Sequence, residues 1–341
     1  MHDQKILIID YGSQYTQLIA RRIRENKTYC EVLQPESLNK KNNFNNAIGV
    51  ILSGGPNSVI KNNYYDLPDT LFENNIPILG ICFGMQLLCK KFKGKIQESI
   101  SREYGKAFLK IKKDEIFFNG LDGELEVWMS HGDSVTEAPD NFSVIASTNK
   151  KNLSAIKEND KDIYGIQFHP EVTHTLDEGK IIYNFVNSIC KSKGNWTTKK
   201  IIDNQIFNIK EKVKNDHVIL GLSGGVDSSV AAAIIHKAIR DQLTCIFIDN
   251  GLLRLNEKKQ VEQGFKGFKN IKIIYVDAAK LFLERLEGII DPEDKRMVIG
   301  KTFVDVFQSE AKKIKNARWL AQGTIYPDVI ESAAVSDNAH L

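Results

Sequence analysis

Cysteine, proline and arginine are scarce in this chain of 341 residues, and no apolar run is long. The five cysteines are an odd number, and their spacing forms neither a metal-ligand pattern nor a disulfide framework. No stretch approaches the roughly 20 apolar residues that a membrane-spanning helix needs, and no signal-peptide pattern precedes the first apolar segment. These absences predict a protein of the reducing cytoplasm with no membrane partner.

A strong excess of charge of either sign is also missing. The 46 basic and 43 acidic residues leave a net charge of +3. Because a nucleic-acid-binding surface normally needs a clear basic excess, no nucleic-acid partner is expected. The hydrophobic content of 42% is sufficient for a buried core, and the length suits two domains.

Short apolar segments alternate with helical patterns along both halves of the chain. In the first half we expect strands at 5–10, 47–52, 77–81 and 163–168, and helices at 14–25, 85–91 and 176–190. Between them, 106–156 is more irregular and β-like. The polar stretch 187–200 contains Gly194 and is the best linker candidate, after which strand-like segments resume at 217–222, 245–248 and 271–276. The pattern predicts two doubly wound α/β domains with mainly parallel sheets, at residues 1–193 and 194–341.

A turn rich in glycine and hydroxyl groups separates the segment 217–222 from a helix expected at 226–239. Its residues are Ser223, Gly224, Gly225, Val226, Asp227, Ser228 and Ser229. Backbone N–H groups at a helix N-terminus bind anions, and small side chains let a chain of phosphates approach the backbone. The turn is not a Walker A loop, since no Gly-Lys-Ser/Thr follows. The alternative interpretation is an ordinary strand-to-helix turn with good capping residues.

A second turn carries Gly80-Ile81-Cys82-Phe83-Gly84, the nucleophile-elbow pattern with cysteine in place of serine. The flanking glycines permit a sharp turn, and the N-terminus of the following helix favours a thiolate. His169 and Glu171 directly follow the segment 163–168, where an imidazole can act as base and a carboxylate can orient it. The alternative for Cys82 is a buried structural cysteine.

Backbone N–H groups near this cysteine are candidates for an oxyanion hole. Ser53-Gly54-Gly55-Pro56 ends the segment 47–52, and the N–H of Phe83 follows the cysteine directly. A plain loop is the alternative for Gly54 and Gly55.

These motifs together resemble the class I, or triad-type, glutamine amidotransferases. The resemblance rests on GICFGMQ (Gly80 to Gln86) and HPE (His169 to Glu171). It implies a flavodoxin-like domain in which Cys82 attacks the glutamine amide, His169 protonates the departing ammonia and then activates water, and Glu171 orients His169. Glutamine would be bound by Gln86 together with the segment Ser130, His131, Gly132 and Asp133, where His131 matters for position rather than for proton transfer.

The turn at 223–229 resembles the pyrophosphate-binding loop of the N-type ATP pyrophosphatases, which cleave ATP between its α and β phosphates. The resemblance implies a domain like those of the adenine-nucleotide α-hydrolases, with AMP and pyrophosphate as products. Adenine and ribose would lie near Asp249, and Mg²⁺ would accompany the pyrophosphate with Asp227 as a ligand.

Later strings extend the resemblance over essentially the whole chain to the family of glutamine-hydrolysing GMP synthetases. They are DKR at 294–296, IGKTF at 299–303 and QGTIYPDVIES at 322–332. The resemblance implies amination of xanthosine 5'-phosphate to GMP, with Arg296, Lys301 and Asp328 at the nucleotide site. Related ligases that make NAD or asparagine use different glutaminase domains. The presence of GICFGMQ and HPE therefore weighs against those ligases.

Members of that family continue beyond the motif at which this chain stops. We therefore expect the chain to lack the C-terminal dimerisation domain that makes full-length relatives homodimers, together with part of the xanthylate site. It is expected to keep the glutaminase machinery and the ATP loop. The alternative is a catalytically silent fragment that serves as a binding or regulatory module.

Overall fold

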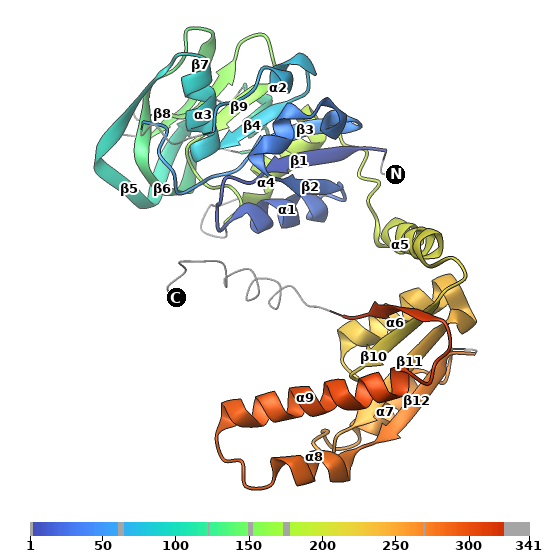
Figure 1. Ribbon diagram of the computed structural model, residues 1–341. Coiled ribbons are helices and arrows are strands. Elements are labelled where there is room, and N and C mark those ends of the chain that lie inside the picture. The colour runs from blue at the N-terminus through green and yellow to red at the C-terminus, as the bar shows by residue number, and fades with distance from the viewer. Residues whose placement is uncertain are drawn as a thin grey trace. The chain divides into compact units, whose positions relative to one another are not determined.

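The computed structural model describes residues 3–60, 65–112, 114–121, 123–148, 153–172, 178–268 and 270–323. The chain divides into two compact units, Met1–Thr197 and Thr198–Leu341, each built on its own sheet (Figure 1). Among the described residues, no helix combines the length and the apolar character needed to cross a membrane.

A nine-stranded sheet forms the centre of the first unit, in the order β2-β1-β3-β4-β9-β8-β7-β5-β6. The first five strands in this order are mutually parallel: β2 (Cys30–Leu33), β1 (Lys5–Ile9), β3 (Ala47–Leu52), β4 (Ile78–Ile81) and β9 (Ile163–Ile166). The other four run antiparallel to their neighbours: β8 (Leu153–Glu158), β7 (Phe142–Thr148), β5 (Lys95–Ile111) and β6 (Glu124–Glu137).

Helices cover both faces of the parallel part of this sheet. Successive residues of a strand point to opposite faces, and in β1 Ile6 belongs to one hydrophobic core while Leu7 belongs to the other. The first core is covered by α1 (Thr16–Glu25) and α4 (Glu178–Tyr183), and the second by α3 (Phe83–Lys91). A parallel sheet buried on both faces is the doubly wound arrangement that the sequence predicts.

The structure differs from the sequence prediction in several details of this unit. The helix expected over 176–190 ends as α4 at Tyr183 and continues as a π-helical segment, Asn184–Ile189. The β-like region 106–156 contains most of a long antiparallel extension of the sheet, and β2 was not predicted. The remaining short helices are α2 (Thr70–Glu73) and the 3₁₀ turns Pro35–Asn39, Lys41–Phe44 and Ile116–Phe118.

The second unit contains a four-stranded parallel sheet in the order β12-β11-β10-β13. Its strands are β10 (His217–Leu222), β11 (Leu243–Asp249), β12 (Lys272–Asp277) and β13 (Ala317–Ala321). Its helices are α5 (Thr198–Val213), α6 (Val226–Ile239), α7 (Glu257–Gly264), α8 (Ala279–Leu286) and α9 (Pro292–Ala311), with a 3₁₀ turn at Arg240–Gln242. The chain passes from β10 to β11 and β12 on one side and returns to place β13 on the other. Ligands of open α/β sheets bind at the carboxyl ends of the strands at such a reversal.

Candidate active site

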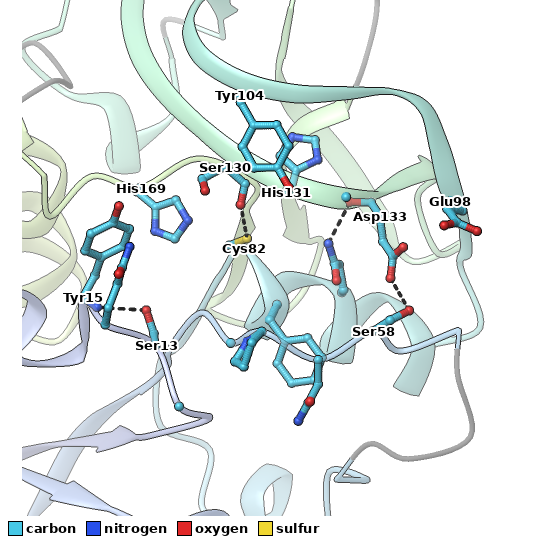
Figure 2. Close-up of a pocket in the computed structure, with 18 residues that line it drawn as sticks. Ser13, Tyr15, Ser58, Cys82, Glu98, Tyr104, Ser130, His131, Asp133 and His169 are labelled. Atoms are coloured by element: carbon cyan, nitrogen blue, oxygen red, sulfur yellow. Dashed lines mark hydrogen bonds between the residues drawn. The ribbon is translucent and has the colours of Figure 1, made fainter. Parts of the chain in front are cut away.

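The carboxyl ends of four parallel strands meet at one edge of the first sheet. The loops after β1, β3, β4 and β9 carry, respectively, Ser13, Gly55, Cys82 and His169. These residues border a cavity of about 500 Å³ (Figure 2). Its opposite wall comes from β5 and β6 and contributes Glu98, Tyr104, Ser130, His131, Gly132 and Asp133.

The backbone at Cys82 is strained, and the two neighbouring glycines allow it. Cys82 has a φ of 52° and a ψ of −102°, a conformation that L-residues rarely adopt. A Cβ atom on Gly80 would lie 2.6 Å from the Gly84 carbonyl oxygen, and one on Gly84 would lie 2.3 Å from the Leu52 carbonyl oxygen. Only glycine therefore lets α3 begin this close to β3 and β4, which places the thiol at the sheet edge.

The Cys82 thiol lies at the cavity wall and is 6% exposed. It donates a hydrogen bond to the Ser130 carbonyl oxygen, with 3.6 Å between sulfur and oxygen. The Gln167 side-chain amide donates to the sulfur at 3.7 Å. Because α3 begins at the next residue, the unpaired N–H groups of its first turn can stabilise negative charge that develops beside the sulfur.

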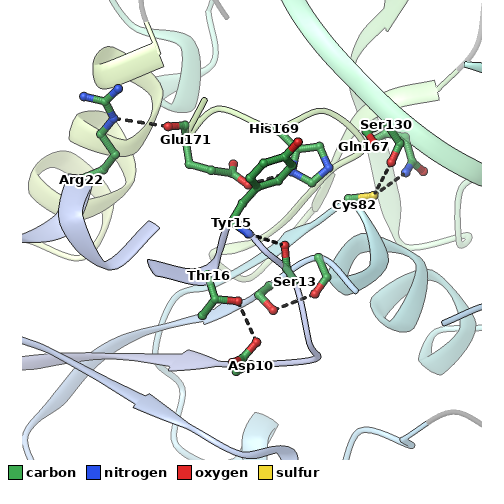
Figure 3. Close-up of polar contacts among 12 residues, drawn as sticks. Asp10, Ser13, Tyr15, Thr16, Arg22, Cys82, Ser130, Gln167, His169 and Glu171 are labelled. Carbon is green, nitrogen blue, oxygen red and sulfur yellow. Dashed lines mark hydrogen bonds and ion pairs between the residues drawn. The ribbon is translucent and has the colours of Figure 1, made fainter. Parts of the chain in front are cut away.

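His169 and Glu171 form a buried pair just beyond the end of β9 (Figure 3). The imidazole Nδ1 lies 2.7 Å from Glu171 Oε1, and the two residues are 4% and 1% exposed. Burial by itself lowers the pKa of His169. The Glu171 carboxylate and hydrogen bonds to Cys82 and Glu171 outweigh burial and raise this pKa well above its usual value. With Nδ1 engaged by Glu171, Nε2 is the nitrogen that can exchange a proton with the sulfur.

The predicted glutamine-binding residues lie on the other side of Cys82. The Gln86 side-chain amide donates to the Asp133 carbonyl oxygen at 2.9 Å, which ties α3 to β6. Ser58 donates to Asp133 Oδ2 at 2.5 Å. Gln86, Ser130, Gly132 and Asp133 all line the cavity with Cys82. The structure therefore brings together residues from separate segments that the sequence analysis assigned to one pocket.

The predicted oxyanion-hole candidates occupy two different places. Gly55 and Phe83 line the cavity, and the Phe83 N–H has no acceptor inside α3 because it opens the helix. Gly54 instead packs against the imidazole, since a Cβ atom there would lie 3.2 Å from His169 Cε1. A Cβ atom on Gly55 would lie 2.7 Å from the Tyr11 carbonyl oxygen, so this position requires glycine.

The cavity also includes residues that the sequence analysis did not single out. They are Gly12, Ser13, Gln14, Tyr15, Asn57, Ser58, Glu98 and Tyr104. The loop at 12–15 directly follows a parallel strand, and this position was an available signal because such loops meet at one sheet edge. Glu98 and Tyr104 come from the antiparallel strand β5, and no spacing in the sequence places that strand beside Cys82.

In the second unit, the turn at 223–229 follows β10 and includes the first residues of α6, at the point where the strand order reverses. Gly224 has a φ of +81°, and a Cβ atom on it would lie 2.9 Å from Val261 Cγ2. The Ser228 hydroxyl lies 3.0 Å from that of Ser223 and donates to the Gly225 carbonyl oxygen at 3.2 Å. The turn is therefore held by its own hydroxyls, and Ser223 and Gly225 are exposed.

Other predicted nucleotide-binding residues surround this turn. Val226 and Asp227 are exposed in the first turn of α6. The Ser229 hydroxyl donates to the Gly225 carbonyl oxygen at 2.8 Å. Asp249 ends β11, and its Oδ1 accepts from the Gly251 N–H at 3.1 Å. On the other side, a Cβ atom on Gly323 would lie 3.1 Å from the Ser228 nitrogen, so the segment after β13 closely approaches the turn.

The structure describes two of the three predicted xanthylate-binding residues. Arg296 and Lys301 are exposed on α9, and Arg296 pairs with Glu293. Neither lines the cavity of about 610 Å³ that borders Ser223 and Ser228. Asp328 lies outside the described residues. Within the described ranges, no group of three His, Cys, Asp or Glu residues is arranged to hold a metal ion, and Asp227 belongs to no such group.

Comparison with known families agrees with this geometry. The model of class I glutamine amidotransferases matches residues 7–189, which is more than half of the chain. The match contains the strained cysteine, the histidine–glutamate pair and all the residues that line the cavity. The chain therefore belongs to the class I glutamine amidotransferase family. The NAD synthase family model matches residues 199–280, which include the turn at 223–229.

Individual similar proteins point to a more specific group within these families. The chain is 50% identical over 334 residues to GMP synthase [glutamine-hydrolyzing] of Aliivibrio fischeri, and 51% identical over 334 residues to that of Vibrio vulnificus. Each alignment covers 98% of this chain but only 65% of the relative's length. A solved structure from Thermoplasma acidophilum, of a protein assigned provisionally as one GMP synthase subunit, is 28% identical with a TM-score of 0.50. It covers 60% of this chain and 99% of its own.

Proposed function

We propose that this chain carries the glutaminase and ATP-binding parts of a glutamine-dependent GMP synthase. The observation that carries the proposal is the strained Cys82 turn beside the buried His169–Glu171 pair, at the wall of a cavity large enough for an amino acid. The high identity to relatives of that name over 98% of the chain supports xanthosine 5'-phosphate as the acceptor.

In the proposed hydrolysis, Cys82 passes its thiol proton to His169 Nε2, and the sulfur attacks the side-chain carbonyl carbon of glutamine. The carbonyl oxygen becomes an oxyanion, which the N–H groups of Phe83 and Gly55 stabilise. His169 gives a proton to the departing ammonia, and a thioester remains on Cys82. His169 then takes a proton from water, whose oxygen displaces the sulfur to release glutamate. Glu171 keeps Nδ1 engaged through both steps, so Nε2 carries the proton.

In the proposed synthetase reaction, the C2 oxygen of xanthosine 5'-phosphate attacks the α-phosphorus of ATP and pyrophosphate leaves. Ammonia then attacks C2, and AMP leaves with the oxygen. The turn at 223–229 suits the pyrophosphate because of its left-handed Gly224, its exposed backbone and its place at the N-terminus of a 14-residue helix. Asp249 would contact the nucleoside part, and Arg296, Lys301 and Asp328 would serve the xanthylate.

Mg²⁺ would bind together with ATP. Magnesium usually keeps several waters and binds through one or two carboxylates plus phosphates. The exposed carboxylate of Asp227 in the turn fits that mode, which needs no cage of protein ligands. Cytoplasmic location and a homodimeric full-length protein belong to the same proposal.

Product analysis tests this function. The chain is incubated with glutamine, and glutamate and ammonia are measured. It is then incubated with Mg-ATP, xanthosine 5'-phosphate and ammonium ion, and the nucleotide products are separated. Glutamate with ammonia is expected from the first incubation, and any ATP that turns over in the second is expected to give AMP with pyrophosphate. ADP as the ATP-derived product would contradict the proposed adenylation.

Glu171→Gln is expected to move the alkaline limb of glutamine hydrolysis to lower pH. The amide keeps the shape of the side chain but removes the negative charge that raises the His169 pKa. Because only the contact with Cys82 then opposes burial, this pKa falls, and His169 loses the proton needed by ammonia at a lower pH. The measurement is the pH dependence of kcat/KM. An alkaline limb at the same pH in both proteins would show that Glu171 does not set the charge of His169.

Gly224→Ala is expected to weaken binding of Mg-ATP by about tenfold or more. The left-handed φ costs an L-residue roughly 1–2 kcal/mol, and the new methyl group contacts Val261, so the turn must shift. Calorimetric titration of the chain with Mg-ATP measures the effect. Gly264→Ala is the matched control, because a Cβ atom there meets nothing within 4 Å. Equal affinities for the two variants would rule out the turn as the phosphate site.

A further inference from the structure

The loop after β1 brings a tyrosine against the catalytic imidazole. The rings of Tyr15 and His169 lie with centroids 5.2 Å apart and planes inclined by 69°. Figures 2 and 3 both show the Tyr15 ring beside the imidazole. Tyr15 also lines the cavity and is partly buried. The ring is therefore a wall of the active site as well as a neighbour of His169.

The loop that presents this tyrosine is held by its own hydrogen bonds. Asp10 Oδ1 accepts from the Gly12 N–H at 2.9 Å and from the Thr16 hydroxyl at 2.7 Å. The Ser13 hydroxyl oxygen accepts from the Tyr15 N–H at 3.1 Å. Gly12 has a φ of +88°, which permits the tight turn. None of these contacts involves His169, so the tyrosine is presented by a turn that is already ordered.

The histidine needs a constraint besides its bond to Glu171. A hydrogen bond at Nδ1 fixes one atom of the imidazole but leaves the ring free to tilt about that contact. On one side, backbone at Gly54 limits this motion, since a Cβ atom there would lie 3.2 Å from His169 Cε1. Tyr15 supplies a second surface. Arg22, in the last turn of α1, donates from Nε to the Glu171 carbonyl oxygen at 3.4 Å. Tyr15 directly precedes this helix, so neighbouring parts of the chain contact both members of the pair.

We propose that Tyr15 is a positioning residue for glutamine hydrolysis: its ring packs against His169 and holds Nε2 toward Cys82. The proposal rests on the proposed glutaminase function. The aromatic ring performs this role and the hydroxyl is not needed, so phenylalanine can replace tyrosine but an aliphatic side chain cannot. Misplacing a proton-transfer group by about 1 Å can cost up to about 100-fold in rate.

Steady-state glutamine hydrolysis by Tyr15→Leu and Tyr15→Phe tests this role. Tyr15→Leu is expected to lower kcat about tenfold or more and to change KM for glutamine less than about twofold. Tyr15→Phe is expected to stay within about twofold of the unaltered chain in both constants. Tyr183→Leu is the matched control, because Tyr183 is a 46% exposed ring at the end of α4. An unchanged kcat in Tyr15→Leu, a loss confined to KM, or an equal loss in Tyr15→Phe would each overturn the proposal.

A second variant tests the same role without altering the tyrosine. Asp10→Ala removes the acceptor that holds the turn, and it is expected to lower kcat in the same direction as Tyr15→Leu. The double variant should then be no slower than the slower single variant, because both changes release the same ring. Multiplicative losses would overturn the proposal. Absence of Cys82-dependent ammonia release in the unaltered chain would instead contradict the proposed function itself, and the Tyr15 role with it.

Discussion

Cys82→Ala is expected to abolish ammonia release from glutamine, with a loss of at least about 10⁴-fold in kcat. The loss is large because no other described residue at the cavity wall combines a thiol with a helix N-terminus and a histidine–carboxylate pair. The change removes one sulfur atom, and its weak contacts to Ser130 and Gln167 contribute little to stability. A coupled assay for glutamate and ammonia measures the effect.

Cys89→Ala is the matched control for this variant. Cys89 lies on the same helix, and burial raises its pKa to about 12, so it remains a thiol at neutral pH. Its contact is with the Glu137 carbonyl oxygen rather than with the cavity. Cys89→Ala should therefore keep its glutaminase activity. Loss of activity in both variants would show that removing any buried thiol from α3 disrupts the site, and would contradict a specific role of Cys82 as the nucleophile.

Gly84→Ala is expected to have the largest effect on folding, with at least about 3 kcal/mol lost from the free energy of unfolding. A Cβ atom there would lie 2.3 Å from the Leu52 carbonyl oxygen and 2.8 Å from its Cβ atom, so α3 must move away from β3. The movement also displaces the strained turn, and the glutaminase reaction is expected to fail in any fraction that still folds. Denaturant unfolding and the glutaminase assay measure the two effects.

Gly179→Ala serves as the control for the added methyl group. Gly179 lies on α4, and a Cβ atom on it would meet nothing within 4 Å. It should unfold at nearly the same denaturant concentration as the unaltered chain. Equal stability of Gly84→Ala and Gly179→Ala would show that the close approach of α3 to β3 does not require glycine.

The parallel parts of both sheets could be predicted because their strands are short apolar runs that end in glycine or polar residues. The segments 47–52 and 217–222 are examples, and the structure gives these bounds for β3 and β10. The antiparallel extension was harder to predict from the sequence. The strand β5 contains charged residues at many positions, such as Glu98 and Lys106, and one of its faces is largely exposed. Its pairing with β6 depends on contacts distant in sequence, which local periodicity does not encode.

The candidate site was predictable where the backbone imposes a residue type. The glycines on both sides of Cys82 are required by the close packing of α3, and His169 and Glu171, two positions apart, follow the end of a strand. Tyr15 was not predictable in the same way. A tyrosine after a strand is common. Its role can be inferred only from its contact with His169, which lies 154 positions further along the chain.

The central claim is that Cys82 is the nucleophile of a glutamine-binding cavity, and covalent labelling tests it most directly. The chain is treated with a glutamine analogue that carries an electrophilic diazoketone in place of the amide, and the modified peptides are identified by mass spectrometry. All five cysteines are buried, so simple exposure does not favour any one of them. The account predicts a single adduct on Cys82 that excess glutamine prevents. An adduct on Cys30, Cys89, Cys190 or Cys245, or labelling of Cys82 that glutamine does not slow, would contradict it.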